Sequence, residues 1–307
     1  MKDKLVTLFG GGGFLGRYIA QDLLARGIRV RIAQRDPRQA WFLKPLGNLG
    51  QTQFVAADVT RPETLERAVA GADAVVNLVG ILSGDFEAVH VAGAGNVARA
   101  AADARVPALV HISAIGADPD SPSAYGRSKA KGEAAVRDAF PAATILRPSI
   151  VFGREDSFVN RFARMAAAPV LPVIAARTRF QPIYAADVAA AVVKAIVEPG
   201  AHAGQTCELG GPDVIAMGDL VRWIAKTTGR KPVIVEVPDG AASLLASLPG
   251  APITRDQLCM LRHDNVVSGS LPGIEAFGVR PTPLATVAPS WLVQYRRHGR
   301  FGLPSAA

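Results

Sequence analysis

An apolar segment at residues 4–9 runs directly into a glycine-rich turn, and the turn opens an amphipathic helix. A bound diphosphate needs close approach to the backbone and free N–H groups at a helix N-terminus, where the helix dipole favours negative charge. Glycine supplies the tight turn and lacks the Cβ that would block this approach. A flexible glycine loop is the alternative, but the order of strand, turn and helix favours a dinucleotide site. The expected contacts are Gly10, Gly13, Phe14, Leu15 and Gly16.

Strands and helices alternate after this turn, with short connections. Strands are expected at 29–34, 53–57, 74–78 and 109–113, and helices at 87–104 and 125–140. This alternation is typical of a doubly wound parallel α/β sheet of the Rossmann type, which binds ligands at the carboxyl ends of its strands. We therefore expect a dinucleotide-binding Rossmann domain at residues 1–152, with its sheet completed by parts of 180–212. Residues 153–307, where the alternation fades, are expected to form a smaller, discontinuous C-terminal lobe for a substrate or a partner.

The end of the strand at 29–34 bears on the type of dinucleotide. An NAD site places Asp or Glu there to bond the ribose 2′-hydroxyl. This strand ends instead in Gln34 and Arg35, with Arg38 close behind. A guanidinium can bind a 2′-phosphate through two parallel hydrogen bonds, and a carboxylate would repel it. Asp36 is the counter-argument, and an exposed loop charge is the other interpretation of Arg35, but the pattern favours NADP(H) over NAD(H).

Two further strand ends carry candidate cofactor contacts. Asp58 and Val59 follow the third strand. A carboxylate there can accept a hydrogen bond from the adenine amino group, or it can cap the next helix. Asn77, Val79 and Gly80 end the fourth strand, where the backbone would pass the ribose.

Tyr125 and Lys129 stand four residues apart at the start of the helix that follows the fifth strand. Residues at this spacing share one helix face. A nearby ammonium lowers the pKa of a phenol, and the phenol can then exchange a proton with a carbinol while hydride moves to nicotinamide. Lys129 is also placed to hold the nicotinamide ribose. These two residues are the catalytic candidates and are counted among the cofactor contacts.

Together these motifs resemble the short-chain dehydrogenase/reductase superfamily, in its extended or atypical branch of NAD-dependent epimerase/dehydratase-like proteins. The resemblance covers residues 4 to about 225. It rests on Gly10–Gly16, Asp58–Val59, Asn77–Gly80, His111–Ala114, Tyr125–Lys129, Leu146–Gly153, Phe180–Tyr184, Asp187–Val188 and Glu208–Pro212.

The resemblance implies a complete cofactor site and an incomplete catalytic site. Its segment at 146–153 turns back over the nicotinamide, which makes Pro148 and Ile150 cofactor contacts, and Ser113 is counted with them. Active members place a Ser or Thr just after the fifth strand to bond the substrate oxygen. The corresponding position here is Ala114 or Ile115, and Ser113 is expected to face elsewhere because neighbouring strand side chains alternate. Loss of a positioned donor costs roughly 10²-fold or more in rate.

This departure, with Arg35 and the segment Pro252–Leu258, resembles a narrower group: the nucleotide-binding accessory subunit of respiratory complex I (NADH:ubiquinone oxidoreductase). Members hold NADPH without known turnover and serve assembly or stability. The resemblance thus implies an accessory component of complex I with little or no turnover. The alternatives are an NAD(P)-dependent oxidoreductase or sugar-nucleotide epimerase/dehydratase using Tyr125 and Lys129, or a sensor of the NADP(H) redox state.

Composition bears on partners and location. The net charge is +8, but no basic run with interleaved aromatic residues appears and aromatic content is only 6%, so nucleic acid is not an expected partner. Cys207 and Cys259 are isolated and the five histidines are scattered, so no metal site is expected and no histidine receives a role. No apolar run reaches 18 residues and the first strand begins by residue 4, so neither a membrane span nor a signal peptide is expected. The expected location is cytoplasmic, or peripheral on the cytoplasmic face of the inner membrane.

The C-terminal segment is basic. Arg280, Arg296, Arg297 and Arg300 follow the last acid, and Trp291, Leu292 and Tyr295 lie among them at near-helical spacing. An exposed Trp/Tyr face beside arginines would suit an anionic lipid surface or a complex I subunit. A docked C-terminal helix with a basic end is the other interpretation.

Overall fold

The computed structural model describes residues 4–247 and 253–301, and the chain divides into two compact units. The first unit comprises Met1–Pro148, Ala185–Leu209 and Ser268–Arg280. The second comprises Ser149–Tyr184, Gly210–Val267 and Pro281–Ala307. The domain limits expected from the sequence, 1–152 and 153–307, stay a prediction.

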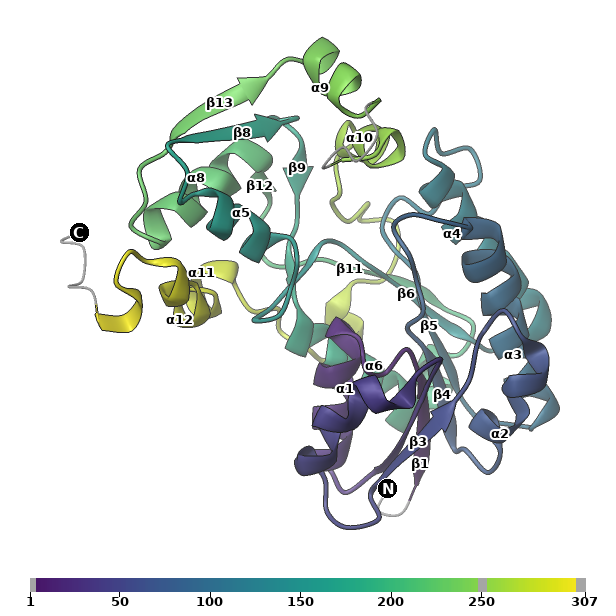
Figure 1. Ribbon diagram of the computed structural model, residues 1–307. Coiled ribbons are helices and arrows are strands. Elements are labelled where there is room, and N and C mark those ends of the chain that lie inside the picture. Colours follow the sequence, from purple (N-terminus) through teal and green to yellow (C-terminus); the bar gives the residue numbers. More distant parts are fainter. Residues whose placement is uncertain (1–3, 248–252, 302–307) are drawn as a thin grey trace. The chain divides into compact units, whose positions relative to one another are not determined.

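A seven-stranded parallel sheet forms the centre of the first unit (Figure 1). Its order is β11-β6-β5-β4-β1-β2-β3. The strands are β1 Leu5–Phe9, β2 Arg29–Gln34, β3 Thr52–Ala56, β4 Ala74–Asn77, β5 Leu109–Ile112, β6 Thr144–Pro148 and β11 Thr206–Leu209. The chain runs outward from β1 through β2 to β3 and then crosses back to β4 on the other side of β1. The strand order therefore reverses at the carboxyl ends of β1 and β4, where sheets of this type bind their ligands, and it confirms the predicted Rossmann-type sheet.

Helices cover both faces of this sheet. They are α1 Phe14–Ala25, α2 Glu66–Val69, α3 Gly93–Asp103, α4 Ala124–Ala139, α6 Ala185–Val197 and α7 Pro199–His202, with short 3₁₀ segments η1 Pro37–Leu46, η2 Pro62–Thr64 and η4 Ile274–Phe277. Helices α1 and α6 pack side by side on one face, and α3 and α4 pack on the other (Figure 1). All five residues of β1 and all four of β4 are buried, as expected for central parallel strands.

The helix expected at 87–104 is interrupted by a π-helical turn. This turn, η3, spans Glu87–Ala92 and precedes α3. Close packing accompanies it: a Cβ added at Gly132 of α4 would lie 2.1 Å from the carbonyl oxygen of His90. Such turns add a residue to the helical ladder and often occur beside functional sites.

The second unit is built from short elements. Its strand pairs are β7 Val151–Phe152 with β10 Ile183–Tyr184, β8 Val170–Ile174 with β13 Val233–Val237, and β9 Arg179–Phe180 with β12 Ile215–Ala216. Its helices are α5 Val159–Met165, α8 Met217–Thr227, α9 Asp239–Leu245, α10 Arg255–Leu261, α11 Leu284–Val287 and α12 Pro289–Leu292, followed by η5 Val293–Tyr295 and η6 Gly299–Phe301. In the expected Pro252–Leu258 segment, Pro252 lies outside the described residues, and Thr254 with Gln257 forms a capping box that begins α10.

The C-terminal helices are docked rather than presented to solvent. Trp291 is 6% exposed and Leu292 is fully buried, in a core cluster with Phe152, Leu220 and Ile224. Of the two interpretations from the sequence, the docked C-terminal helix is confirmed for Trp291 and Leu292, because their side chains complete this core. Within residues 4–247 and 253–301, no helix is both long enough and apolar enough to cross a membrane.

Candidate nucleotide-binding site

The glycine turn joins β1 to α1 with the geometry that a diphosphate requires. Gly10 has a positive φ of 76°, which favours glycine, and its N–H donates to the carbonyl of Ala33 at 2.9 Å. A Cβ added at Gly16 would lie 2.4 Å from the carbonyl oxygen of Gly11, so the helix packs directly on the turn. Gly13 is the exposed N-cap of α1, and neither a side-chain cap nor an acid occupies the first turn. Phe14, Leu15 and Gly16 thus form a helix start without a competing negative charge.

Two separate polar contacts form at the end of β2, one made by Gln34 and one by Asp36. Gln34 accepts from the N–H of Gly12 at 3.0 Å and donates to the Asp36 carbonyl at 2.7 Å, so it ties the strand end to the glycine turn. Asp36 binds Arg38, with Nε 3.0 Å from Oδ1, and the hydrogen bond from this guanidinium lowers the pKa of Asp36. Arg38, which follows Arg35 closely in the sequence, is thus paired with Asp36. Arg35 is exposed at the strand end, where its charge acts on Asp58.

Asp58 closes the turn after β3. Its Oδ1 accepts from the N–H of Thr60 at 3.0 Å and from the hydroxyl of the same residue at 2.8 Å. Burial raises the pKa of Asp58, but the Thr60 hydrogen bonds and the charges of Arg35 and Arg61 outweigh it and lower the pKa. Val59 is 6% exposed and packs in the core, and its carbonyl accepts from Asn96 at 3.0 Å.

The segment after β4 lies against the glycine turn. A Cβ added at Gly10 would contact the Val79 side chain at 3.3 Å. Asn77 is buried, and its side-chain oxygen accepts from the Val79 N–H at 3.1 Å, which turns the chain sharply. Gly80 follows, with His90 3.7 Å from its missing Cβ. The fold thus brings the predicted contacts of β1 and β4 together at the point where the strand order reverses.

Tyr125 and Lys129 share the first turns of α4, which Ser123 caps by accepting from the Gly126 N–H. Lys129 is 4% exposed, and its Nζ donates to the Ile112 carbonyl at 2.9 Å. Burial lowers the pKa of Lys129 to about 8, although the Glu133 charge acts in the opposite direction. Burial also raises the pKa of Tyr125 to about 12. The expectation that Lys129 lowers the phenol pKa is therefore wrong, because desolvation dominates and the phenol stays protonated.

His90 connects the segment after β4 to α4, and the sequence analysis assigned it no role. Its Nε2 accepts from the Ile81 N–H at 2.9 Å, so the ring proton is on Nδ1, which donates to Ser128 Oγ at 2.8 Å. Ser128 Oγ in turn donates to the Tyr125 carbonyl at 2.8 Å. Burial, and next the Lys129 charge, lower the pKa of His90 to about 4, so the ring is neutral.

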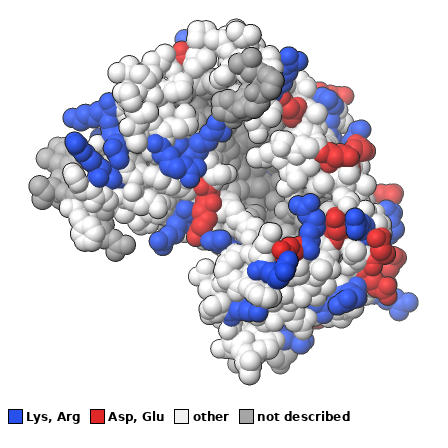
Figure 2. All heavy atoms as spheres, in the orientation of Figure 1, with Lys and Arg blue, Asp and Glu red and all other residues white. Residues whose placement is uncertain are grey.

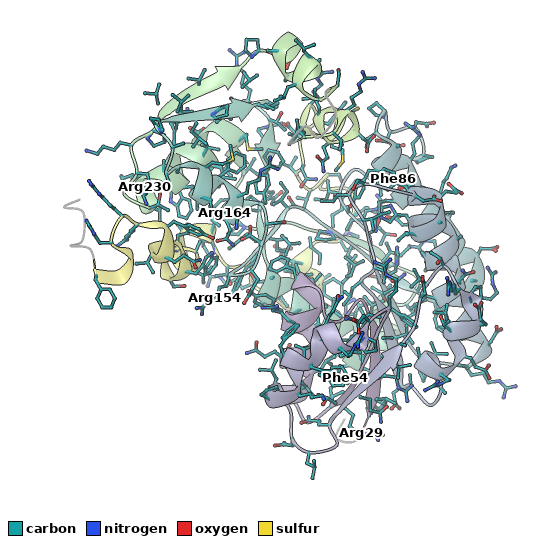
Figure 3. All side chains as sticks on the ribbon, viewed as in Figure 1. Arg29, Phe54, Phe86, Arg154, Arg164 and Arg230 are labelled. Atoms are coloured by element: carbon teal, nitrogen blue, oxygen red, sulfur yellow. The ribbon has the colours of Figure 1, made fainter. Side chains whose placement is uncertain are left out.

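Two aromatic rings complete this arrangement. Phe86, which is labelled in Figure 3, stacks on the His90 ring with centroids 5.3 Å apart. Tyr125 meets the His90 ring edge-on at 5.4 Å and the Phe86 ring at 6.0 Å. The sequence signals this arrangement only by a histidine within an alanine-rich helix. The partners of His90 on α4, Ser128 and Tyr125, lie more than 30 residues further along the chain.

Ser113 is bound within the core of the first unit. Its hydroxyl donates to the Glu133 carboxylate, and Arg147 binds the same carboxylate through two bonds of 2.8 and 2.7 Å. Glu133 is 6% exposed, so this is a buried ion pair. Ala114 and Ile115, the two residues that follow, carry no hydroxyl. The Glu133–Arg147 ion pair thus binds the Ser113 hydroxyl, which is the last hydroxyl in residues 109–115.

The two remaining cofactor candidates lie two residues apart in the chain. Pro148 ends β6, and its carbonyl accepts from the Ile115 N–H at 3.1 Å. Ile150 belongs to the second unit, where its N–H donates to the Asn265 side chain at 3.0 Å. Among the described residues, no cluster of His, Cys, Asp and Glu is arranged to hold a metal ion.

Comparisons with known proteins agree with this geometry. The model of the NAD dependent epimerase/dehydratase family matches residues 6–210. Mitochondrial NADH dehydrogenase (ubiquinone) 1 alpha subcomplex subunit 9 of Mus musculus is 36% identical over 292 residues, which cover 91% of this chain and 77% of that protein. Ceramide reductase of Caulobacter vibrioides is 30% identical over 241 residues, covering 76% and 74%.

A solved structure shows the same fold. The triphenylmethane reductase of Citrobacter sp., complexed with NADP(H), superposes with a TM-score of 0.76 over 93% of this chain and 99% of that chain, at 21% identity. The family match spans the glycine turn, all seven strands of the sheet and α4. The chain therefore belongs to the NAD dependent epimerase/dehydratase family.

Proposed function

We propose that this chain is an NADP(H)-binding accessory component of respiratory complex I with little or no turnover. Its proposed location is cytoplasmic, at the periphery of the inner membrane. The likeness to the Mus musculus subunit over 91% of this chain supports the partner. The proposed lack of turnover is supported by the residues that directly follow β5. Ser113 is bound to Glu133, and the next residue is Ala114, which carries no hydroxyl.

In this function the nucleotide stabilises the fold. A ligand present at 100 times its Kd adds about 2.7 kcal/mol to the stability of the state that binds it. The proposed contacts come from the ends of β1, β2, β3 and β4 and from α4, so binding would join segments distributed over the first unit. Tyr125 and Lys129 would then serve as contacts to the nicotinamide ribose rather than as a proton-transfer pair.

A native gel tests the partner. The protein is tagged in its host, membranes are solubilised gently, and the gel is stained for NADH dehydrogenase activity. We expect the tag to migrate with the active band, and nucleotide released from that band to be NADPH or NADP⁺. A protein found only free of the membrane, at all detergent strengths, would contradict the proposal.

We propose that Arg35 selects NADP(H). Hydrogen bonds to charged groups contribute about 1.5–3 kcal/mol, so Arg35→Ala should weaken NADPH binding by roughly 10- to 100-fold and leave NADH binding nearly unchanged. The measurement is the Kd of each nucleotide by fluorescence titration. Arg38→Ala is the matched control, because Arg38 already pairs with Asp36 and should change NADPH affinity much less. Equal losses for both nucleotides in Arg35→Ala would assign the site to NAD(H).

An oxidoreductase is the second candidate, because Tyr125 and Lys129 are both present on α4 and one relative is a ceramide reductase. Ala114→Ser restores the missing hydroxyl. A positioned donor contributes roughly 10²-fold or more in rate, so the variant separates the two functions. We expect no NADPH oxidation above background with a panel of ketones for either protein. A rise of about 10²-fold in Ala114→Ser, absent in the control Ala117→Ser, would favour the oxidoreductase.

The basic C-terminal residues are proposed to face the partner complex or anionic lipid. These residues are Arg280, Arg296 and Arg297, and no acid follows Glu275 in the sequence. Trp291 is buried, so this contact would be electrostatic rather than aromatic.

A further inference from the structure

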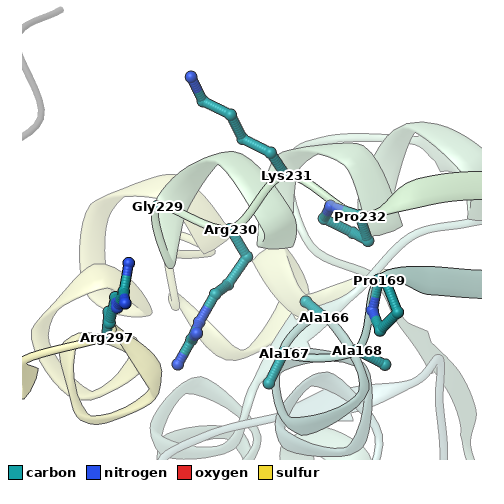
Figure 4. A pocket seen from close by; sticks show the side chains of 9 residues that line it. All are labelled: Ala166, Ala167, Ala168, Pro169, Gly229, Arg230, Lys231, Pro232 and Arg297. Atoms are coloured by element: carbon teal, nitrogen blue, oxygen red, sulfur yellow. The ribbon is translucent and has the colours of Figure 1, made fainter.

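A small pocket in the second unit lies far along the chain from the nucleotide candidates. It forms where α5 turns into β8 and α8 turns into β13, and its volume is about 370 Å³ (Figure 4). Its lining residues are Ala166, Ala167, Ala168, Pro169, Gly229, Arg230, Lys231, Pro232 and Arg297. Pockets of this size, at the small end of the ligand-binding range, suit a single small group.

One cation at this pocket is held in place. Arg230 Nε donates to the Tyr295 carbonyl at 3.0 Å, which fixes the guanidinium at the pocket wall. Figure 4 shows Arg230 and Arg297 approaching the same space from two sides, whereas Lys231 extends away from it. A guanidinium fixed in this way retains its terminal N–H groups for a ligand.

The positive charge here exceeds what the protein balances. In the part of the chain that the structure describes, no ion pair joins Arg230, Lys231 or Arg297 to a carboxylate. Other arginines of the same unit do pair, Arg179 with Asp264 and Arg222 with Asp219. Lys and Arg side chains accordingly gather around the end of α8 and the start of β13 (Figure 2).

Helix C-termini account for only part of this charge. Helices α5 and α8 both end at the pocket, and each C-terminus carries roughly half a negative elementary charge. The two arginines that face the pocket, against about one negative charge from the two helix ends, leave about one positive charge unbalanced. The anionic phosphate group of a phosphate ester would offset this charge.

One wall of the pocket is apolar, and none of the nine lining residues is acidic. Three alanines, at positions 166, 167 and 168, and two prolines, 169 and 232, provide it, and the Pro169 carbonyl is already engaged by the Val233 N–H at 2.8 Å. An anion beside the arginines would meet no carboxylate among the lining residues. The carbon body of its ester would meet the alanine and proline side chains.

We propose that this pocket binds a phosphate ester, with its oxygens on Arg230 and Arg297 and its carbon body against the alanine and proline wall. Arginine suits this role because its planar fork matches two phosphate oxygens. The phosphate belongs either to a free metabolite or to the headgroup of an anionic lipid. This site shares no residue with the nucleotide site, and its Arg297 is one of the basic C-terminal residues discussed above.

The experiment uses the full chain and two probes. Inorganic phosphate is titrated by calorimetry, and vesicles of phosphatidylcholine with or without phosphatidylglycerol are tested by flotation. Arg297→Gln removes an exposed guanidinium and leaves the packing intact, and Arg230→Gln removes the fixed one. Lys226→Gln is the control, because it removes an equal charge from exposed α8 surface outside the pocket lining. The glycine turn is unchanged in all of these variants, so any phosphate that it binds contributes equally to each titration.

We expect each arginine variant to weaken binding by roughly tenfold, as loss of one charge-assisted contact predicts, and Lys226→Gln to change it less than twofold. Phosphate binding without vesicle binding would identify a free phosphate ester, and vesicle binding that requires both phosphatidylglycerol and Arg297 would identify a lipid headgroup. Absence of binding by both probes, or equal losses in Lys226→Gln and Arg297→Gln, would overturn the proposal.

Discussion

Gly13→Asp should abolish dinucleotide binding while the protein stays folded. Gly13 is exposed and has extended backbone, with φ −75° and ψ −178°, which any residue can adopt. A Cβ added there meets only the Gly10 carbonyl, at 3.2 Å, and aspartate is a favourable N-cap for α1. Its carboxylate would stand where the diphosphate must sit. Two like charges about 4 Å apart repel by about 4 kcal/mol near a protein surface, which corresponds to a loss of roughly a thousandfold.

The measurement is the NADPH Kd, read beside the thermal midpoint of the unliganded protein. Gly240→Asp is the matched control. It adds the same charge in the first turn of α9, where a Cβ meets no atom within 4 Å, and should leave nucleotide affinity unchanged. A Kd for Gly13→Asp within twofold of the wild type would show that the nucleotide does not bind at the glycine turn.

Glu133→Ala should cost about 3–5 kcal/mol of the free energy of unfolding, because removing one partner of a buried ion pair leaves the other charge uncompensated. Arg147 keeps only 22% of its side chain exposed and donates two bonds to Glu133, and hydrogen bonding to Glu133 raises the pKa of Arg147. Ser113 loses its acceptor in the same variant. The midpoint of urea unfolding, with the slope held common, measures the loss.

Two comparisons sharpen this result. Replacing both charges, as Glu133→Leu with Arg147→Met, should recover much of the lost stability, because apolar pairs of similar volume often replace buried ion pairs without loss. Glu198→Ala, which breaks the exposed pair with Lys194, should cost under about 1 kcal/mol. A cost for Glu133→Ala no larger than that for Glu198→Ala would show that the buried pair adds nothing beyond a surface pair.

The sequence was sufficient for five of the seven strands of the central sheet, whereas β6 was not predicted and β11 was expected only somewhere within 180–212. Residues 29–34 are the β2 strand as expected, and β4 and β5 differ from expectation by one residue at their ends. Central parallel strands are apolar on both faces, so a continuous apolar run between turn signals identifies them well. The same reasoning placed the candidate contacts at strand ends, and the fold brings those of β1 and β4 together.

Side-chain partners were harder to foresee. The contacts of His90 with Ile81 and Ser128 join residues that are 9 and 38 positions apart, and no periodicity encodes such pairs. The predicted direction of the Tyr125 pKa shift was wrong, because the spacing of residues reveals a neighbouring charge but not the degree of burial. The second unit was the least predictable part, since strands of two residues give no pattern and β8 pairs with β13 from a distant part of the chain.

The order of strands in the first unit also constrains how the protein is made on the ribosome. A nascent chain that has reached Pro148 holds six of the seven strands, yet β6 is then an outer strand with unpaired backbone groups. Its neighbour β11 emerges only after residues 149–184 and α6 have been synthesised, and η4, which packs on α6 and β11, emerges later still. Translation that stops between residues 149 and 205 therefore releases chains in which the β6 edge of the sheet is unpaired and prone to aggregation. Premature termination in this window should yield aggregates, whereas termination beyond residue 280 leaves every strand of the sheet with its neighbours.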